Sequence, residues 1–342
     1  MSGQIIQSEI AEIPAVFSRI ISNQKAFADA VALIKGRDIN NVIIVARGTS
    51  AHAGLFLKTL IETELGLPAG LASPSAVSIN GAKLNYRNSL VIGISQSGQS
   101  PDLLNYLKAA SDGGALLITM TNDANSPMAK SADLHLDLQA NPEKALAATK
   151  SYSAQLLTAL ILVRTWSGNT KNLSNAGDLV ADILRRNQIS DSLIKEITQH
   201  SNLVFVGRGF ALANAREGAL KIQETSFKFV QGFSAADYIH GPMAAIDKNC
   251  TVFFLAPKAS NMRGFEKAAA ETRDRGASVI WLGSGGAVKS GETVINGCES
   301  DDEPLNCVVD ATLIQLLAVK LALSLGHNPD TSRGLNKVTL TH

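Results

Sequence analysis

Hydroxyl and amide side chains gather in a short loop at residues 95–101, which has the sequence Ser-Gln-Ser-Gly-Gln-Ser-Pro. Ser100 and Pro101 are typical of a helix start, with Ser at the N-cap and Pro at the first helical position. A helix N-terminus presents backbone N–H groups and the positive end of the helix dipole to a ligand. The side chains that add further donors are Ser95, Gln96, Ser97 and Ser100. The loop therefore predicts a site for a small anion such as a phosphate monoester.

A second pair of hydroxyls, Thr49 and Ser50, follows the apolar run at residues 41–48. We expect it beside the first loop, because ligands of parallel α/β sheets bind beyond the carboxyl ends of the strands. The loop lacks the lysine of a nucleotide P-loop and the G-x-G-x-x-G spacing, which favours a small phosphorylated molecule over a nucleotide. The alternative is an ordinary polar loop with a capping serine.

Acidic and basic residues share one face of a predicted helix at residues 216–229, where Glu217, Lys221, Glu224 and Lys228 have the spacing i, i+4, i+7 and i+11. Such a row is either a solvated face with Glu–Lys pairs or part of a catalytic site. His240 follows in a loop held by Gly and Pro, and a histidine titrates near neutral pH and can donate a proton. A structural or idle histidine is the alternative.

The elements that carry these residues occur twice. Residues 41–48 align with residues 202–209 at an offset of 161, and two later apolar runs keep nearly the same offset. Runs of four to six apolar residues rich in Val, Ile and Leu are typical of buried parallel strands. With amphipathic stretches between them, they predict two tandem α/β domains, each a parallel sheet flanked by helices in three αβα layers.

The expected boundaries follow from this repeat and from shifts in composition. We expect an N-terminal helical segment (1–40), a first domain (41–165), a helical linker (166–200), a second domain with an apolar helix at residues 311–326 (201–328), and a C-terminal tail (329–342).

Composition excludes several classes of protein. The 31 Lys and Arg nearly balance the 30 Asp and Glu, so we expect neither a nucleic-acid nor a membrane partner. No apolar stretch reaches about 20 residues and the N-terminus lacks a secretion signal, which favours the cytoplasm. Cys250, Cys298 and Cys307 fit neither a disulfide framework nor a zinc site, so we expect free thiols. No His/Asp/Cys cluster predicts a metal, and we expect no cofactor. The acidic run at residues 299–303 is expected in a solvated loop.

Taken together, the motifs resemble a known family. The segments GTS, SQSGQSPDLL, ALAATKSY, EGALKIQE, IHGPMAAI and RGLNKVTL are similar to those of the sugar isomerase (SIS) fold, in particular to the isomerase domain of glucosamine-6-phosphate synthase. The resemblance covers nearly the whole chain and implies two tandem SIS domains. It also implies that the phosphate is bound by Thr49, Ser50, Ser95, Gln96, Ser97 and Ser100.

The resemblance further implies the roles of five residues. Glu224 is similar to the base that moves a proton between C1 and C2, and His240 to the acid/base that opens the sugar ring. Lys337 is similar to the tail lysine near C1 and C2, in a tail that orders over the sugar. Glu143 and Lys221 match residues that orient the sugar. The ring-opening histidine of the synthase reaches into the partner's site, which implies a homodimer with shared active sites.

One departure from the synthase decides the expected activity. Only about 40 residues precede the first predicted strand, none of them cysteine, so we expect no release of ammonia from glutamine. The chain then resembles the stand-alone SIS deaminases, which convert glucosamine 6-phosphate and water to fructose 6-phosphate and ammonia. The alternatives are a deglycase or isomerase of another amino-sugar phosphate (fructosamine 6-phosphate or galactosamine 6-phosphate), or a non-catalytic sugar-phosphate sensor.

Overall fold

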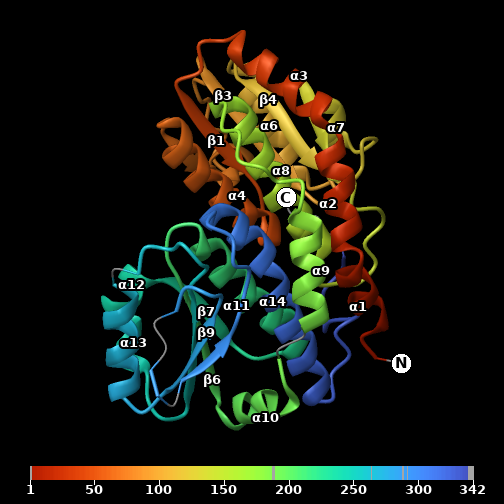
Figure 1. Cartoon of the computed structure of the whole chain (residues 1–342). Coiled ribbons are helices and arrows are strands. Elements are labelled where there is room, and N and C mark those ends of the chain that lie inside the picture. Colours follow the sequence, from red (N-terminus) through yellow and green to blue (C-terminus); the bar gives the residue numbers. More distant parts are fainter. Residues whose placement is uncertain (1, 187–188, 263, 287–288, 291, 338–342) are drawn as a thin grey trace. The chain divides into compact units, whose positions relative to one another are not determined.

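Figure 1 shows a computed structural model that describes residues 2–186, 189–262, 264–286, 289–290 and 292–337. The chain divides into two compact units, each with its own sheet. The N-unit comprises Ala15–Glu143, Lys150–Ser174 and Leu335–His342. The C-unit comprises Met1–Pro14, Lys144–Thr149 and Asn175–Gly334.

The N-unit contains a five-stranded parallel sheet in the order β2-β1-β3-β4-β5. Every residue of the two strands β3 and β4 is buried, as their runs of Val, Ile and Leu predict for strands covered on both faces. The strands are β1 (Asn41–Val45), β2 (Ala69–Leu71), β3 (Ser89–Ser95), β4 (Leu116–Thr121) and β5 (Leu134–Asp137).

Helices follow the strands of this sheet. The predicted helix start is confirmed, because Ser100 is the N-cap and Pro101 the first residue of α6. The helix α8 is buried all round from Lys150 to Arg164, which explains its lack of a polar face. The helices are α2 (Ile13–Ser22), α3 (Gln24–Lys35), α4 (Gly48–Leu60), the π-helix η1 (Ile61–Leu65), α5 (Pro74–Ser78), α6 (Pro101–Asp112), α7 (Pro127–Ser131) and α8 (Lys150–Ser167).

The C-unit contains a second five-stranded parallel sheet in the order β10-β9-β8-β6-β7. Its strands correspond one to one with those of the first sheet, so the same order confirms the repeat predicted from the sequence. The strands are β6 (Asn202–Gly207), β7 (Val230–Ser234), β8 (Cys250–Leu255), β9 (Ser278–Leu282) and β10 (Thr293–Ile295).

The apolar helix α14 packs against α9, α10 and α11 in the C-unit (Figure 1). By length and composition α14 could cross a membrane, but 78% of its most apolar window is buried, as in the core helix of a water-soluble domain. The helices of the C-unit are α1 (Gln4–Ala11), α9 (Ala176–Arg186), α10 (Asp191–Gln199), α11 (Ala211–Ser226), α12 (Ala235–Ile239), the 3-10 helix η2 (Pro242–Ala245), α13 (Phe265–Asp274) and α14 (Glu303–Ser324).

Two details of this region concern the sequence-based expectations. The solvated loop expected at residues 299–303 is wrong for its last two residues, because Asp302 is a buried N-cap and Glu303 begins α14 and accepts a hydrogen bond from Ser260. The three cysteines are free and buried, as expected, and burial raises the pKa of the Cys307 thiol well above its usual range. These thiols pack in the C-unit.

Candidate active site

Two loops at one edge of the N-unit sheet carry the predicted phosphate donors. The strands β1 and β3 are parallel neighbours, with Val45 opposite Gly93, so the chain leaves both at the same edge. Thr49 and Ser50 lie in the first turn of α4, directly after β1. The loop after β3 leads into α6. The hydroxyls and the N-termini of both helices therefore meet at this edge, as an anion site requires.

The loop between β3 and α6 is held in one conformation by its own side chains. Ser95 Oγ accepts a hydrogen bond from the Gly98 N–H at 3.0 Å, and Ser97 Oγ accepts one from the Gln99 N–H at 3.4 Å. Gly98 has φ +63°, and a Cβ there would lie 2.3 Å from Ser126 Oγ, so the turn needs glycine. Ser100 makes no side-chain cap bond to α6. The helix cap therefore does not occupy its hydroxyl.

Arg47 and Asp102 form an ion pair at this edge. Arg47 Nε lies 2.8 Å from Asp102 Oδ2, which places a half-exposed guanidinium against a buried carboxylate. Burial lowers the pKa of His135, whose Nε2 lies 2.9 Å from Thr121 Oγ1, and this favours a neutral imidazole at pH 7. Beside this paired guanidinium, the N–H and O–H groups of the two loops are the donors that an anion at this edge could use.

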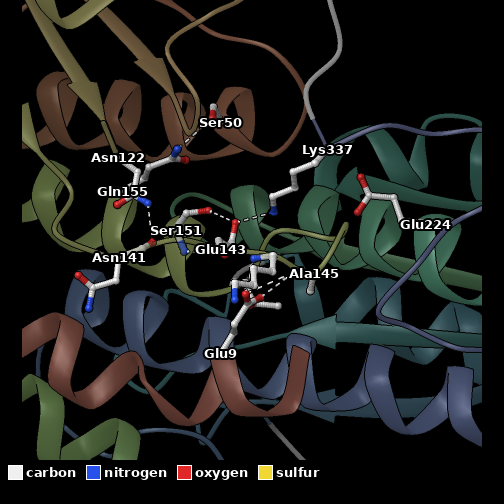
Figure 2. A network of polar contacts seen from close by, with 12 residues as sticks. Glu9, Ser50, Asn122, Asn141, Glu143, Ala145, Ser151, Gln155, Glu224 and Lys337 are labelled. Atoms are coloured by element: carbon white, nitrogen blue, oxygen red, sulfur yellow. Dashed lines mark hydrogen bonds and ion pairs between the residues drawn. The ribbon is translucent and has the colours of Figure 1, made fainter. Parts of the chain in front are cut away.

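The first two turns of α8 contact Ser50 at this edge of the sheet and also two further predicted site residues, Glu143 directly and Lys337 through Glu143. Gln155 donates through Nε2 to Ser50 Oγ at 2.9 Å. One turn earlier, on the same face of the helix, Ser151 donates to the Glu143 carboxylate through its backbone N–H (3.0 Å) and its Oγ (2.7 Å). Lys337 Nζ reaches the same carboxylate at 2.9 Å (Figure 2). Two sets of polar contacts, Gln155 with Ser50 and Ser151 with Glu143 and Lys337, thus lie one helical turn apart on α8 in the N-unit.

Glu143 occupies a position that favours an ionised carboxylate. Its side chain is fully buried, whereas Lys337 is about a quarter exposed. The carboxylate accepts a backbone N–H in the first turn of α8, where the helix dipole favours negative charge. Both of its oxygens accept hydrogen bonds, and one of them also faces the Lys337 ammonium. The geometry suits a residue that holds Lys337 in place.

The second group of predicted residues lies on α11 in the C-unit. Lys221 Nζ lies 3.4 Å from Glu217 Oε1 and also donates to Glu224 Oε2. The side chains of Glu217 and Lys221 are 1% and 2% exposed, so the solvated-face interpretation is wrong for these two residues. Glu224 is 18% exposed and is the member of the group that solvent or a ligand can reach. Lys228 points elsewhere and donates to the His200 carbonyl.

The start of the C-terminal tail packs beside the end of α11. The Arg333 guanidinium lies 4.2 Å from the centre of the Phe227 ring, and the His327 ring meets the same ring edge-on. Phe227 has φ +54° and ends α11 three residues after Glu224. Cation–π and edge-to-face contacts of this kind offset part of the entropy of ordering a tail. The tail predicted at residues 329–342 extends beyond the described residues after Lys337.

His240 stands apart from these groups. It caps the C-terminus of α12, where its N–H donates to the Asp237 carbonyl, and its side chain is exposed. Tyr238 anchors the segment through its hydroxyl, which lies 2.8 Å from Thr272 Oγ1. In the part of the chain that the structure describes, no hydrogen bond or ion pair joins the His240 side chain to Glu224.

Sequence reasoning missed three residues of these networks. Ser151 lies inside the quoted segment ALAATKSY, and Gln155 follows it by one helical turn, so helical spacing could have indicated both. Glu9 accepts hydrogen bonds from the backbone of Lys144 and Ala145. A lone carboxylate on a short helix carries no sequence signal for such a contact.

Comparison with known proteins shows which family the chain belongs to. The model of the SIS domain family matches residues 37–164 and 196–324. A glutamine–fructose-6-phosphate aminotransferase (isomerizing) of Aquifex aeolicus is 30% identical over 338 residues, which cover 96% of this chain but 56% of that protein. The chain thus spans about half the length of the curated relatives it matches.

Two solved structures have the same fold. One, from Silicibacter pomeroyi DSS-3, is provisionally described as a phosphosugar isomerase; it is 27% identical, with a TM-score of 0.89 over 96% of this chain and 100% of that chain. A glucosamine-6-phosphate deaminase of Thermotoga maritima is 23% identical, with a TM-score of 0.80 over 99% of this chain and 100% of that chain. At this identity the second likeness concerns the fold alone.

Proposed function

Because the chain belongs to the SIS domain family, we propose that it is a sugar-phosphate isomerase that works as an amino-sugar-phosphate deaminase. The proposed reaction converts glucosamine 6-phosphate and water to fructose 6-phosphate and ammonia. The observation that supports the proposal is that one face of α8 in the N-unit contacts the Ser50 hydroxyl through Gln155 and, one turn earlier, the Glu143 carboxylate that faces Lys337 through Ser151. It gives one ligand a place for its phosphate and a cation for its reacting end.

In the proposed mechanism the phosphate is held by the loops after β1 and β3. The hydroxyls of Ser97 and Ser100 and the helix N-termini donate to its oxygens. This anchoring makes the reaction of the sugar effectively intramolecular, because the reacting carbons are held in place by a group that does not react. The residues assigned to the phosphate are Thr49, Ser50, Ser95, Gln96, Ser97 and Ser100.

The chemical steps are assigned to three side chains. His240 transfers the proton that opens the pyranose ring, Glu224 takes the proton from C2, and the same carboxylate delivers it to C1. Lys337 stabilises the negative charge that develops in the enolamine-like transition state. The product of this transfer is an imine at C2. Water adds to C2, the C2–N bond breaks, and ammonia leaves.

Two residues support these roles because each contacts one of the catalytic side chains and holds it in place. Lys221 is buried and donates to Glu224, which fixes the direction of that carboxylate. Glu143 is buried and accepts from Lys337, which fixes the ammonium. Both therefore orient groups that contact the sugar. The proposal places the enzyme in the cytoplasm, with no cofactor.

The alternatives concern the substrate. A deglycase or isomerase acting on fructosamine 6-phosphate or galactosamine 6-phosphate would use the same phosphate site and the same base. A sugar-phosphate sensor would bind without turnover. The experiment is a comparison of kcat/KM for these amino-sugar phosphates with the purified chain, measured as ammonia release. Glucosamine 6-phosphate should have the highest value, whereas binding with no turnover of any compound would identify a sensor.

The phosphate assignment predicts a large loss of affinity in a double variant. Ser97→Ala with Ser100→Ala removes two donors, and each charge-assisted hydrogen bond contributes about 1.5 to 3 kcal/mol. We expect KM to rise more than about tenfold, measured with the phosphorylated substrate. The control is Ser111→Ala at the exposed end of α6, which should leave KM unchanged. A KM within twofold of wild type in the double variant would refute the assignment.

The exposed position of His240 supports a homodimer in which this histidine completes the partner's site. The prediction is complementation between two inactive variants, His240→Ala and Glu224→Gln. After subunit exchange, half of the dimers are hybrids with one intact site, which restores up to about a quarter of wild-type activity in a symmetric dimer. Exchange is checked with tagged subunits. No recovery after proven exchange would assign both residues to one chain's site.

A further inference from the structure

The segment between β5 and α8, residues 138–149, is irregular, half of its residues are buried, and it carries Glu143. Buried backbone N–H groups outside regular structure need partners from elsewhere. The first half of the segment is held by Asn122, which accepts from the Ala140 N–H and donates to the Asn141 carbonyl. Asn141 has φ +57°, in the left-handed region that asparagine adopts more readily than most non-glycine residues.

The second half of the segment is held by Glu9 of α1. Glu9 is buried, with 4% of the residue exposed. Its carboxylate accepts hydrogen bonds from the N–H groups of Lys144 and Ala145, and both of its oxygens lie within 3.4 Å of the Ala145 nitrogen (Figure 2). These three residues lie in the C-unit. Glu143 precedes Lys144 by one peptide bond, so Glu143 sits between two clamped pieces of backbone.

The helix α1 that carries Glu9 is itself held by the tail. Its N-cap, Gly3, provides no side-chain cap. Asn328 Oδ1 accepts from the Gly3 N–H at 3.0 Å, and Asp330 Oδ1 accepts from the Ile6 N–H at 2.8 Å, so tail residues satisfy the first N–H groups of the helix. The Asp330 carbonyl also accepts from the Leu146 N–H. One junction in the C-unit thus joins α1, the segment after Glu143 and the start of the tail.

We infer that Glu9 is a positioning residue for the Glu143–Lys337 ion pair. By fixing the backbone of Lys144 and Ala145, it sets the place of the Glu143 carboxylate, which in turn holds the Lys337 ammonium and the Ser151 N–H. Its effect on turnover rests on the function proposed above. Its effect on the backbone of the segment does not.

The first test uses hydrogen exchange of the ligand-free, full-length chain. Glu9→Gln keeps the shape of the side chain but replaces one acceptor oxygen by an amide group that cannot accept. We expect the amides of Lys144, Ala145 and Ser151 to exchange at least about tenfold faster, since local openings set these rates. The strand β8 (Cys250–Leu255) should keep its wild-type exchange. The matched control, Asp29→Asn, removes an exposed carboxylate of α3 and should change none of these amides.

The second test uses kinetics. Glu9→Gln should lower kcat about 10- to 100-fold, because a small misplacement of a catalytic group has effects of this size, and should leave KM within about threefold because the phosphate loops are untouched. Combined with Glu143→Gln, it should have no further effect on kcat, since both substitutions act on the same group. A residue that only stabilises the fold would give independent, multiplying effects.

The outcomes separate the inference from the proposed function. Wild-type exchange at Lys144, Ala145 and Ser151 in Glu9→Gln overturns the inference, whatever the activity. Faster exchange in a chain that turns over no amino-sugar phosphate supports the positioning and refutes the function. Multiplying effects in the double variant also overturn the inference. Should Glu9→Gln not fold, Glu9→Asp, which keeps the carboxylate one methylene shorter, serves for both measurements with the same expected directions.

Discussion

Glu224→Gln lowers kcat for deamination by about 10² to 10⁴, because the amide is nearly isosteric with the carboxylate but cannot accept the C2 proton. The variant retains an oxygen that can accept from Lys221, so the arrangement of α11 should persist. KM for the phosphorylated sugar should stay near its wild-type value, because the residues assigned to the phosphate belong to other loops. Steady-state rates of ammonia release give both constants.

The matched control for this prediction is Glu266→Gln, which makes the same chemical change at an exposed position of α13. It should leave kcat unchanged. Near wild-type turnover in Glu224→Gln would exclude Glu224 as the base. A fall in kcat together with loss of the native circular dichroism spectrum would show that the variant is unfolded. In that case kcat is measured on refolded, soluble protein, and that value decides whether Glu224 is the base.

Removal of the chain after Gly334 abolishes both ammonia release and the reverse amination of fructose 6-phosphate by free ammonium. The truncation deletes Lys337, and with it the cation that faces Glu143 and that the proposed mechanism assigns to the transition state. The contacts of His327 and Arg333 with Phe227 remain, so the tail start keeps its place on α11. The thermal midpoint should therefore change little.

A point variant separates the charge of Lys337 from the rest of the tail. Lys337→Gln in the full chain should reproduce most of the loss of kcat, whereas Lys108→Gln, which removes an exposed ammonium of α6, should have no effect. Full activity of the truncated chain would show that the tail is not part of the site. Retained binding of sugar phosphate by the truncated chain, measured by calorimetry, would show that the phosphate loops work without it.

The repeat and the strand order could be predicted because their signal is local and occurs twice. Runs such as Leu90–Ser95 and Thr251–Ala256 are apolar enough to be buried on both faces, and they occupy matching places in the two sheets. The start of α6 could be predicted because the N-cap preference of Ser and the fixed φ of Pro act within two residues.

The parts of the site that could not be predicted depend on distant residues. The spacing of Glu217 and Lys221 fits a solvated face as well as a buried pair, and only tertiary packing decides between them. The contact of Glu9 with Ala145 spans 136 residues of sequence, and that of Lys337 with Glu143 spans 194. Residue type and helical period carry no information over such separations. The resemblance to a family suggests roles for Glu143 and Lys337, and the structure shows that their side chains pair.

One measurement tests the central claim most directly: carbon NMR of glucosamine 6-phosphate labelled with ¹³C at C2 during incubation with the purified chain. The labelled atom remains C2 throughout. Proton transfer from C2 to C1, followed by hydrolysis, predicts that its signal shifts from that of an amine-bearing carbon to that of the anomeric carbon of fructose 6-phosphate, with one ammonium formed for each ketose. Glu224→Gln should leave the labelled signal unchanged over the same period. A wild-type spectrum that keeps the C2–N bond while the sugar phosphate is bound would contradict the deaminase assignment.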